Sequence, residues 1–162
     1  MPEAFAIIDI GKTNSRAILA DLTLRHEIAQ RRMENRVLAG PPYPHLDVAA
    51  QADFILRALA DFAARGPVAG VMVIGHGATV ALVDDAGLVL PVLDYEHNGP
   101  DELAADYDRL RPPFAQTGSP RMAGGLNIGA QLHWLRARFP QQAARAQHAL
   151  FWPQFWTWQL TG

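Results

Sequence analysis

Short apolar stretches separated by turn residues open the chain. Residues Phe5–Ile10 are apolar at every position but one, which predicts a buried β-strand. Gly11–Asn14 favours a tight turn and Ser15–Leu22 a return strand, so the two strands are expected to form a hairpin. After a short turn at residues 21–24, Arg25–Met33 predicts a third strand.

The pattern then changes to a helical period. Asp47 is expected to cap a helix that ends near Gly66-Pro67. The apolar positions that repeat along this helix are Val48, Ala52, Ile55, Leu59 and Phe62. Residues Val68–Ile74 are too few and too continuously apolar for an exposed helix, and the valines among them favour a central strand of the sheet.

The second half of the chain carries weaker signals. Residues 78–83 and 88–92 predict a second hairpin, and residues 100–119 form a polar, proline-bearing connection with a short helix near 101–110. A second helical stripe ends at Pro140 and consists of Ile128, Leu132, Leu135 and Phe139. The aromatic cluster near the end predicts core packing rather than a stacking platform; it consists of Phe151, Trp152, Phe155, Trp156 and Trp158.

Composition and charge narrow the classes of partner. The chain has 162 residues, of which 49% are hydrophobic and 19% charged, as expected for one globular domain. The net charge is −2 and the basic residues are scattered, which argues against a nucleic-acid or membrane partner and favours a small molecule. Cysteine is absent, so thiolate chemistry is excluded. No apolar run reaches the roughly 20 residues of a membrane span, and a cytoplasmic location is expected.

The sequence Gly11-Lys12-Thr13 raises the question of which phosphate-binding device it belongs to. A Walker A loop ending here would need glycine at position 6, which is Ala6, and a helix starting at Lys12. A strand is expected instead. In a hairpin, Gly11 lets the backbone approach a ligand, Thr13 and Asn14 offer side-chain donors, and the turn amides can form an anion-binding concavity.

Asp9 ends a hydrophobic strand, where a carboxylate is costly to desolvate unless it has a partner. A hydrated Mg²⁺ that bridges to nucleotide phosphates is one such partner. The alternative is that Asp9 caps the turn, because Asp, Gly and Asn are ordinary turn residues. The residues alone leave both interpretations open.

The order D-I-G-K-T-N-S-R-A-I-L-A-D resembles the first phosphate motif of the actin, Hsp70 and sugar-kinase superfamily. The rest of the chain is similar to the FGGY carbohydrate kinases in three further segments. These are the H-G-A-T quartet at residues 76–79, the stretch D-D-A-G-L-V-L-P at 84–91, and the run from residue 126 to the Leu160-Thr161-Gly162 end. Departures occur at Lys12, at Ile74-Gly75, and at residues 93–97, which replace the family's W-x-D-x-R.

This resemblance implies an α/β, RNase H-like (actin-like ATPase) domain with a mixed sheet that opens in an antiparallel hairpin and is flanked by helices. Residues 1–162 are expected to be the leading part of the kinase N-terminal domain, without the rest of that domain or the second domain. The implied activity is transfer of the γ-phosphoryl group of ATP, with Mg²⁺, to a hydroxyl of a sugar, with ketoses preferred. The family's general base lies beyond the L-T-G run, so the chain alone is expected to be inactive.

The resemblance also implies two groups of site residues. The phosphate side comprises Asp9, Gly11, Lys12, Thr13, Asn14 and Arg16, with Asp9 also serving Mg²⁺ through water. The sugar side comprises His76, Gly77, Asp94, Glu96 and His97. If the two apolar strands run parallel, His76 shares a rim with Asp9.

Several residues keep ordinary structural alternatives. Lys12 and Arg16 can simply face solvent, His76 can be a structural histidine, and residues 94–97 can form a solvated loop. Two other functions also stay open: a non-catalytic nucleotide or sugar sensor of the same superfamily, and a conformational ATPase of the Hsp70 or actin type. The sequence leaves homo-oligomer formation undecided.

Overall fold

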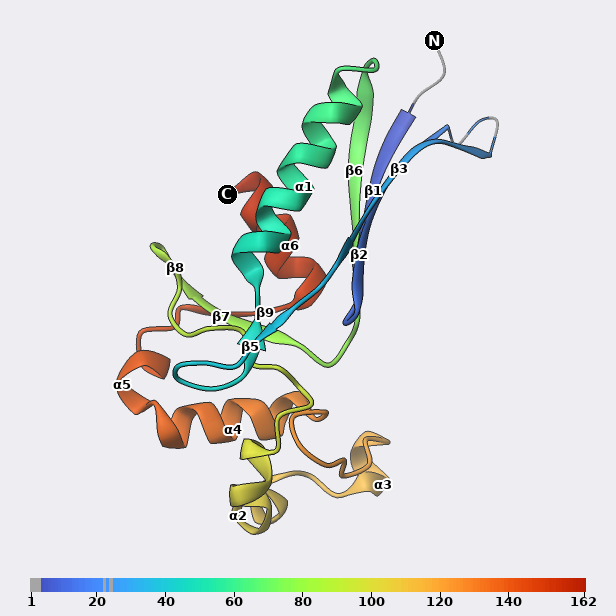
Figure 1. Ribbon diagram of the computed structural model, residues 1–162. Coiled ribbons are helices and arrows are strands. Elements are labelled where there is room, and N and C mark those ends of the chain that lie inside the picture. Colours follow the sequence, from blue (N-terminus) through green and yellow to red (C-terminus); the bar gives the residue numbers. More distant parts are fainter. Residues whose placement is uncertain (1–3, 22, 24) are drawn as a thin grey trace. The chain divides into compact units, whose positions relative to one another are not determined.

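The computed structural model describes residues 4–21, 23 and 25–162 (Figure 1). The chain, expected from its length to be one domain, forms two compact units. Unit 1 contains Met1–Val37, Asp47–His76 and Pro153–Gly162, and unit 2 contains Leu38–Leu46 and Gly77–Trp152.

Unit 1 is built on a four-stranded mixed sheet. Its strands are β1 (Ala4–Ile10), β2 (Asn14–Asp21), β3 (His26–Glu34) and β6 (Val68–Gly75), in the order β3-β2-β1-β6. The β1–β2 and β2–β3 pairs are antiparallel, whereas β6 runs parallel to β1. The predicted opening hairpin, third strand and mixed sheet are therefore confirmed. Of the predicted turn at 21–24, Leu22 and Leu24 lie outside the described residues.

Helix α1 (Val48–Ala63) packs on one face of this sheet (Figure 1). It begins where predicted, because the Asp47 side chain accepts a hydrogen bond from the Ala50 amide at 3.0 Å. Alternate residues of β1, including Ile8 and Ile10, are fully buried, and so are Ile55 and Phe62 of α1. This burial of one sheet face leaves the opposite face, which carries Asp9, more accessible to ligands.

The expectation that Val68–Ile74 is a central strand is wrong for the described residues, since β6 lies at an edge of the sheet. Its side chains are unusually exposed for an apolar strand: Val71 is 49% exposed, Met72 56% and Ile74 45%. A continuous apolar run indicates that both faces of a strand suit burial, but it does not identify the neighbour on each side.

Unit 2 contains a three-stranded antiparallel sheet in the order β8-β7-β9. The predicted second hairpin is present as β7 (Val80–Asp84) and β8 (Gly87–Leu88). Strand β9 (His148–Phe151) was not predicted, because its four residues merge with the aromatic cluster that follows. Two further short strands, β4 (Val37–Leu38) and β5 (His45–Leu46), pair with each other.

The core of unit 2 forms around helix α4 (Ile128–Arg138), which ends before Pro140 as predicted. Its buried cluster consists of Tyr43, Leu90, Leu93, Trp134 and Leu135. The predicted connection contains the 3₁₀ helix η1 (Gly99–Leu103), α2 (Ala104–Leu110) and α3 (Phe114–Thr117). Helix α5 (Pro140–Ala143) follows α4 directly.

The last helix, α6 (Trp152–Thr161), carries the aromatic cluster except Phe151, which ends β9. Trp152, Phe155 and Trp156 are buried, which confirms the predicted core role for these three residues, whereas Phe151 is 51% exposed. Among the described residues, the structure has no helix with the length and apolar character needed to cross a membrane.

Candidate active site

The turn between β1 and β2 is closed by the backbone. The Gly11 amide donates a hydrogen bond to the Asn14 carbonyl at 3.0 Å. A Cβ atom on residue 11 would lie 3.1 Å from that carbonyl oxygen, which is closer than a side chain normally tolerates. Glycine is therefore favoured here by the close packing of the turn.

Asn35 fastens this turn from outside the motif. Its side-chain amide donates to the Gly11 carbonyl at 2.8 Å, and its Oδ1 accepts from the buried Ser15 hydroxyl at 2.8 Å. Its backbone amide also donates to the Thr13 carbonyl at 2.8 Å. Sequence reasoning missed Asn35, because the residue stands just after the third strand and its role depends on where that strand ends.

Asp9 and Arg16 form an ion pair beside the turn. The Arg16 Nη2 lies 2.7 Å from the Asp9 Oδ2, and the two residues are cross-strand partners. The Asp9 side chain is 28% exposed and that of Arg16 49% exposed, so both remain accessible to a ligand. Arg16 thus points back to Asp9 and to the turn.

A cavity of about 360 Å³ opens at this turn. Its lining residues are Asp9, Gly11, Thr13, Asn14, Arg16 and Arg32. Five of these six are predicted phosphate-side residues, and the structure brings them together. The sixth, Arg32, comes from β3, and its Nε donates to the Asn14 Oδ1 at 3.1 Å. Lys12 is half-buried and is not part of the described lining.

His76 follows β6 directly, and Asp9 lies near the end of β1. Because these strands are parallel, with Ile10 opposite Gly75, both residues lie at the carboxyl ends of neighbouring strands. The expectation of a common rim for Asp9 and His76 is therefore confirmed. Such rims are where ligands bind in open α/β sheets.

The remaining predicted sugar-side residues belong to unit 2. Gly77 and Glu96 are exposed, whereas Asp94 is 7% exposed. The Asp94 Oδ1 accepts a hydrogen bond from the Glu96 amide at 3.2 Å, and the Asp94 carbonyl accepts one from the His97 amide at 2.9 Å. Asp94 therefore closes the turn that presents Glu96 and His97.

His97 is held by aromatic packing. Its ring lies edge-on to Trp134 with 5.6 Å between the ring centroids. A Cβ atom on residue 99 would lie 2.5 Å from the His97 Nε2 and 2.8 Å from Cζ2 of Trp134, so Gly99 makes room for this pair. The Trp134 indole in turn donates to Glu102 at 3.4 Å.

The carboxylates of Glu102 and Asp101 bind partners beside this loop. Arg138 pairs with Glu102 and, together with the Trp134 indole, holds the pKa of that carboxyl below its usual range. The Asp101 carboxylate accepts from the Gly124 amide at 2.9 Å, and the Gly125 amide donates to Tyr95 at 2.9 Å. These two amides thus have partners within unit 2.

Gln131 is a second residue that sequence reasoning missed. It is fully buried on α4, and its amide nitrogen donates to the Ala78 carbonyl at 2.8 Å and to the Gly125 carbonyl. It therefore ties the H-G-A-T segment to the start of α4. A lone glutamine in a helical stripe gives no sequence signal for such a role.

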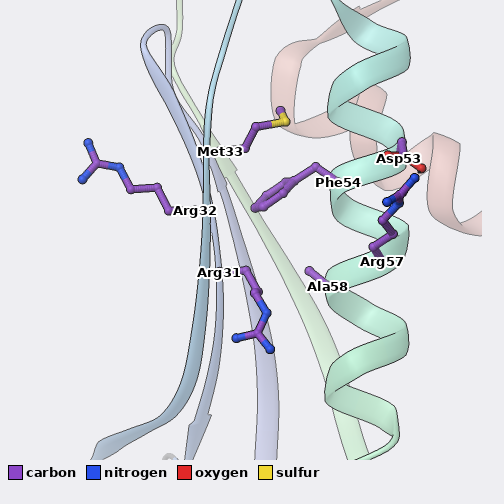
Figure 2. Close-up of a pocket in the computed structure, with 7 residues that line it drawn as sticks. All are labelled: Arg31, Arg32, Met33, Asp53, Phe54, Arg57 and Ala58. Atoms are coloured by element: carbon purple, nitrogen blue, oxygen red, sulfur yellow. Dashed lines mark hydrogen bonds and ion pairs between the residues drawn. The ribbon is translucent and has the colours of Figure 1, made fainter.

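Figure 2 shows a second cavity of about 360 Å³, between β3 and α1. Met33 and Phe54 point toward each other across it, and Ala58 lines it from α1. Two of its three lining arginines have carboxylate partners: Arg31 lies 2.8 Å from Asp61, and Arg57 lies 2.9 Å from Asp53. The third, Arg32, donates to Asn14. This cavity is mainly apolar, unlike the cavity at the turn.

Comparison with solved structures identifies similar proteins. A carbohydrate kinase from Novosphingobium aromaticivorans matches with a TM-score of 0.90 and 38% identity, over 97% of this chain and 33% of that protein. A xylulose kinase from Rhodospirillum rubrum matches with a TM-score of 0.76 and 20% identity, over 97% of this chain and 34% of that protein. A gluconate kinase from Lactobacillus acidophilus matches with a TM-score of 0.72 and 17% identity, over 92% and 32%.

This chain spans about a third of the length of the proteins it matches. No protein-family model matches the sequence, and no curated protein matches it significantly. The structural matches confirm the predicted fold, which is the mixed-sheet, RNase H-like fold of actin-like ATPases.

Proposed function

We propose, on the premise that this chain resembles the N-terminal part of the FGGY carbohydrate kinases, that the complete protein transfers the γ-phosphoryl group of MgATP to a sugar hydroxyl. The observation that carries the proposal is the cavity at the β1–β2 turn. There, a carboxylate, a glycine turn and two guanidinium groups meet. The chain that forms this cavity is 38% identical in sequence to part of a carbohydrate kinase. We further propose that residues 1–162 are the leading part of the first of two domains.

The residues at the turn fit a nucleotide phosphate and its Mg²⁺. Mg²⁺ prefers oxygen ligands and retains several waters, so a single carboxylate, Asp9, suffices to hold it beside the phosphates. Mg²⁺ supplies neutralisation of phosphate charge when bound. Thr13 and Asn14 offer further oxygen and nitrogen atoms at the cavity, and Gly11 allows the backbone to approach.

We propose that Arg16 contacts both Asp9 and a nucleotide phosphate. Its guanidinium pairs with Asp9 at 2.7 Å and thereby orients the carboxylate. The same fork-shaped group matches a phosphate oxygen pair, so a bound nucleotide can share it. Lys12 is the remaining proposed phosphate-side residue, and as a half-buried point charge in the turn it adds to the positive potential.

On the sugar side, we propose His76, Gly77, Asp94, Glu96 and His97 as contacts for sugar hydroxyls. Imidazole and carboxylate groups exchange hydrogen bonds with hydroxyls readily. The turn closed by Asp94 and the packing of His97 on Trp134 hold two of these side chains in fixed orientations. On the family resemblance, we propose a ketose as the substrate. We also propose a cytoplasmic location.

Phosphoryl transfer to an alcohol also needs a carboxylate that accepts the hydroxyl proton. In the family this base lies beyond the L-T-G run. We therefore propose that residues 1–162 alone have no useful kinase activity. Robust sugar-dependent ADP release from this chain by itself would contradict that statement.

A nucleotide or sugar sensor of the same superfamily is the second candidate. It is favoured by the loop at residues 93–97, where the sequence departs from the family pattern. In this loop an oxygen of the Asp94 side chain accepts a hydrogen bond from the Glu96 amide. An aspartate in the family's base position, downstream of Gly162, would argue against a sensor.

The first experiment is to express the complete reading frame and measure ADP release with MgATP across a panel of ketoses, polyols and aldoses. Asp9→Asn serves as the control. One sugar that gives turnover, lost in the variant, establishes the kinase and its substrate. Nucleotide binding without turnover on any sugar favours the sensor, and hydrolysis without sugar favours a conformational ATPase. Size-exclusion chromatography with light scattering of the same sample decides whether the protein is a homo-oligomer.

A further inference from the structure

Three charged residues form a row across the sheet of unit 1. Asp9 on β1 is the register partner of Arg16 on β2, and Arg16 is the register partner of Arg32 on β3. Directly opposite residues in antiparallel strands point to the same face. Two arginines therefore stand side by side on the face that carries the cavity, and like charges in this position destabilise a sheet unless an anion lies between them.

The charges in this row do not cancel. With −1 on Asp9 and +1 on each of Arg16 and Arg32, their sum is +1. Arg16 has its carboxylate, at 2.7 Å. Arg32 donates its Nε to the neutral Asn14 Oδ1 at 3.1 Å, and within the described part of the chain it has no carboxylate at ion-pair distance. This bond leaves the two Nη nitrogens of Arg32 available to an anion.

The neighbouring arginines show that this is a local property of the site. Arg31 precedes Arg32 on the same strand, yet it lies 2.8 Å from Asp61 of α1. Figure 2 shows Arg32 leaving β3 on the side away from α1, whereas Arg31 and Met33 lie on the side of the helix. Alternation along the strand thus sends one arginine to a carboxylate and the next to the cavity lined by Asp9 and Thr13.

We infer that Arg32 is a phosphate-binding residue of this site: its guanidinium binds a phosphate oxygen of the nucleotide, while Asn14 orients it and Arg16 stays paired with Asp9. The inference rests on the proposed function and extends it to a residue outside the hairpin motif. A nucleotide polyphosphate supplies the negative charge that the row lacks, and its oxygens match the planar fork of arginine.

The test uses the protein expressed from its complete reading frame. MgATP affinity is measured by isothermal titration calorimetry at two salt concentrations for the wild type, Arg32→Gln, Arg32→Lys and Arg31→Gln. Arg31→Gln is the matched control, since it removes the neighbouring positive charge on the other face. The Michaelis constants for ATP and sugar and the unfolding temperature are measured for the same four proteins.

Arg32→Gln is expected to weaken MgATP binding about tenfold and to make it less sensitive to salt, as for the loss of one charged hydrogen bond to phosphate. Arg32→Lys is expected to recover part of the affinity. The sugar KM and the unfolding temperature are expected to stay at wild-type values, and Arg31→Gln is expected to bind MgATP normally.

Other outcomes would contradict either the role of Arg32 or the proposed function. If Arg32→Gln binds MgATP as well as the wild type does, the inference is wrong and the kinase proposal stands. A loss of affinity that is accompanied by a lower unfolding temperature and is not recovered by lysine identifies a structural role for Arg32 instead. If the wild type binds no MgATP, both the inference and the proposed function fail.

Discussion

The turn between β1 and β2 and the loop at residues 93–97 were both predicted to bind ligands, but the structure uses their polar residues differently. At the turn, Asp9 and Arg16 lie at a cavity and remain partly exposed. In the loop, the Asp94 carboxylate is buried and closes its own turn, and His97 packs on Trp134. The carboxylate after an apolar strand is thus partly exposed at the turn, whereas in the loop one of its oxygens also holds the backbone turn.

The difference lies in which groups satisfy the polar atoms. At the turn, backbone bonds and Asn35 fix the peptide groups, so the charged side chains are not needed to hold the turn together. In the loop, a side-chain oxygen of Asp94 performs that task. Substitutions in the two regions are therefore expected to affect different quantities.

The largest expected effect comes from the same chemical change made in both regions. In the complete protein, Asp9→Asn is expected to lower kcat/KM on the order of a hundredfold, because it removes the charge proposed to serve Mg²⁺. Asp94→Asn keeps the Oδ1 acceptor of the turn and is expected to raise the sugar KM by less than about tenfold, with the ATP KM unchanged. Steady-state kinetics with both substrates varied checks this, and equal losses in the two variants would remove the contrast.

The next effect concerns stability at the β1–β2 turn. Asn35→Ala removes the bonds to Gly11 and Ser15 and is expected to lower the free energy of unfolding by about 2 kcal/mol. Urea unfolding and hydrogen exchange at the Gly11 amide measure it. Asn98→Ala is the control in the other unit, since Asn98 is exposed and its side chain does not cap η1. If both variants lose the same stability, Asn35 is not a specific brace of the turn.

A smaller effect is expected for Gly99→Ala beside the loop. The new Cβ would meet His97 and Trp134, and such overpacking costs about 1–2 kcal/mol when the neighbours can shift. Near-ultraviolet circular dichroism and thermal unfolding report the displaced ring pair. Gly77→Ala is the matched control, because a Cβ at Gly77 has no heavy atom within 4 Å among the described residues. An unchanged spectrum for Gly99→Ala would show that His97 is not held by Trp134.

The smallest effect is the pH dependence of the Glu102 ion pair. Arg138, and after it the Trp134 indole, lower the pKa of the Glu102 carboxyl, so its stabilising contribution is present above the ordinary glutamate pKa and is lost as pH falls through the depressed value. Thermal unfolding from about pH 6 to about pH 3 is compared for the wild type and Glu102→Gln, with Glu34→Gln as the control. Their unfolding temperatures are expected to differ slightly near neutrality and to converge in acid. A difference in unfolding temperature that grows as the pH falls would contradict the lowered pKa of Glu102.

The sequence predicted most of unit 1, because its signals are local. The hairpin, the helix capped by Asp47 and the strand before His76 all follow from spacing within a few residues. It did not predict β9 or the edge position of β6, because strand order depends on pairing between distant segments. The aromatic cluster was correctly assigned to the core for Trp152, Phe155 and Trp156, but the exposure of Phe151 was not anticipated.

By itself, the sequence determined the turn between β1 and β2 and the order of motifs, since a tight turn after an apolar strand needs only neighbouring residues. Tertiary structure alone decided which residues complete the site. Arg32 meets Asn14 across 18 positions, and Asn35 meets Gly11 across 24. The strand register fixes these contacts, and a shift of one residue would send Arg32 to the opposite face. A few neighbouring residues determine the conformation of a turn, whereas the packing of the whole sheet determines the strand register.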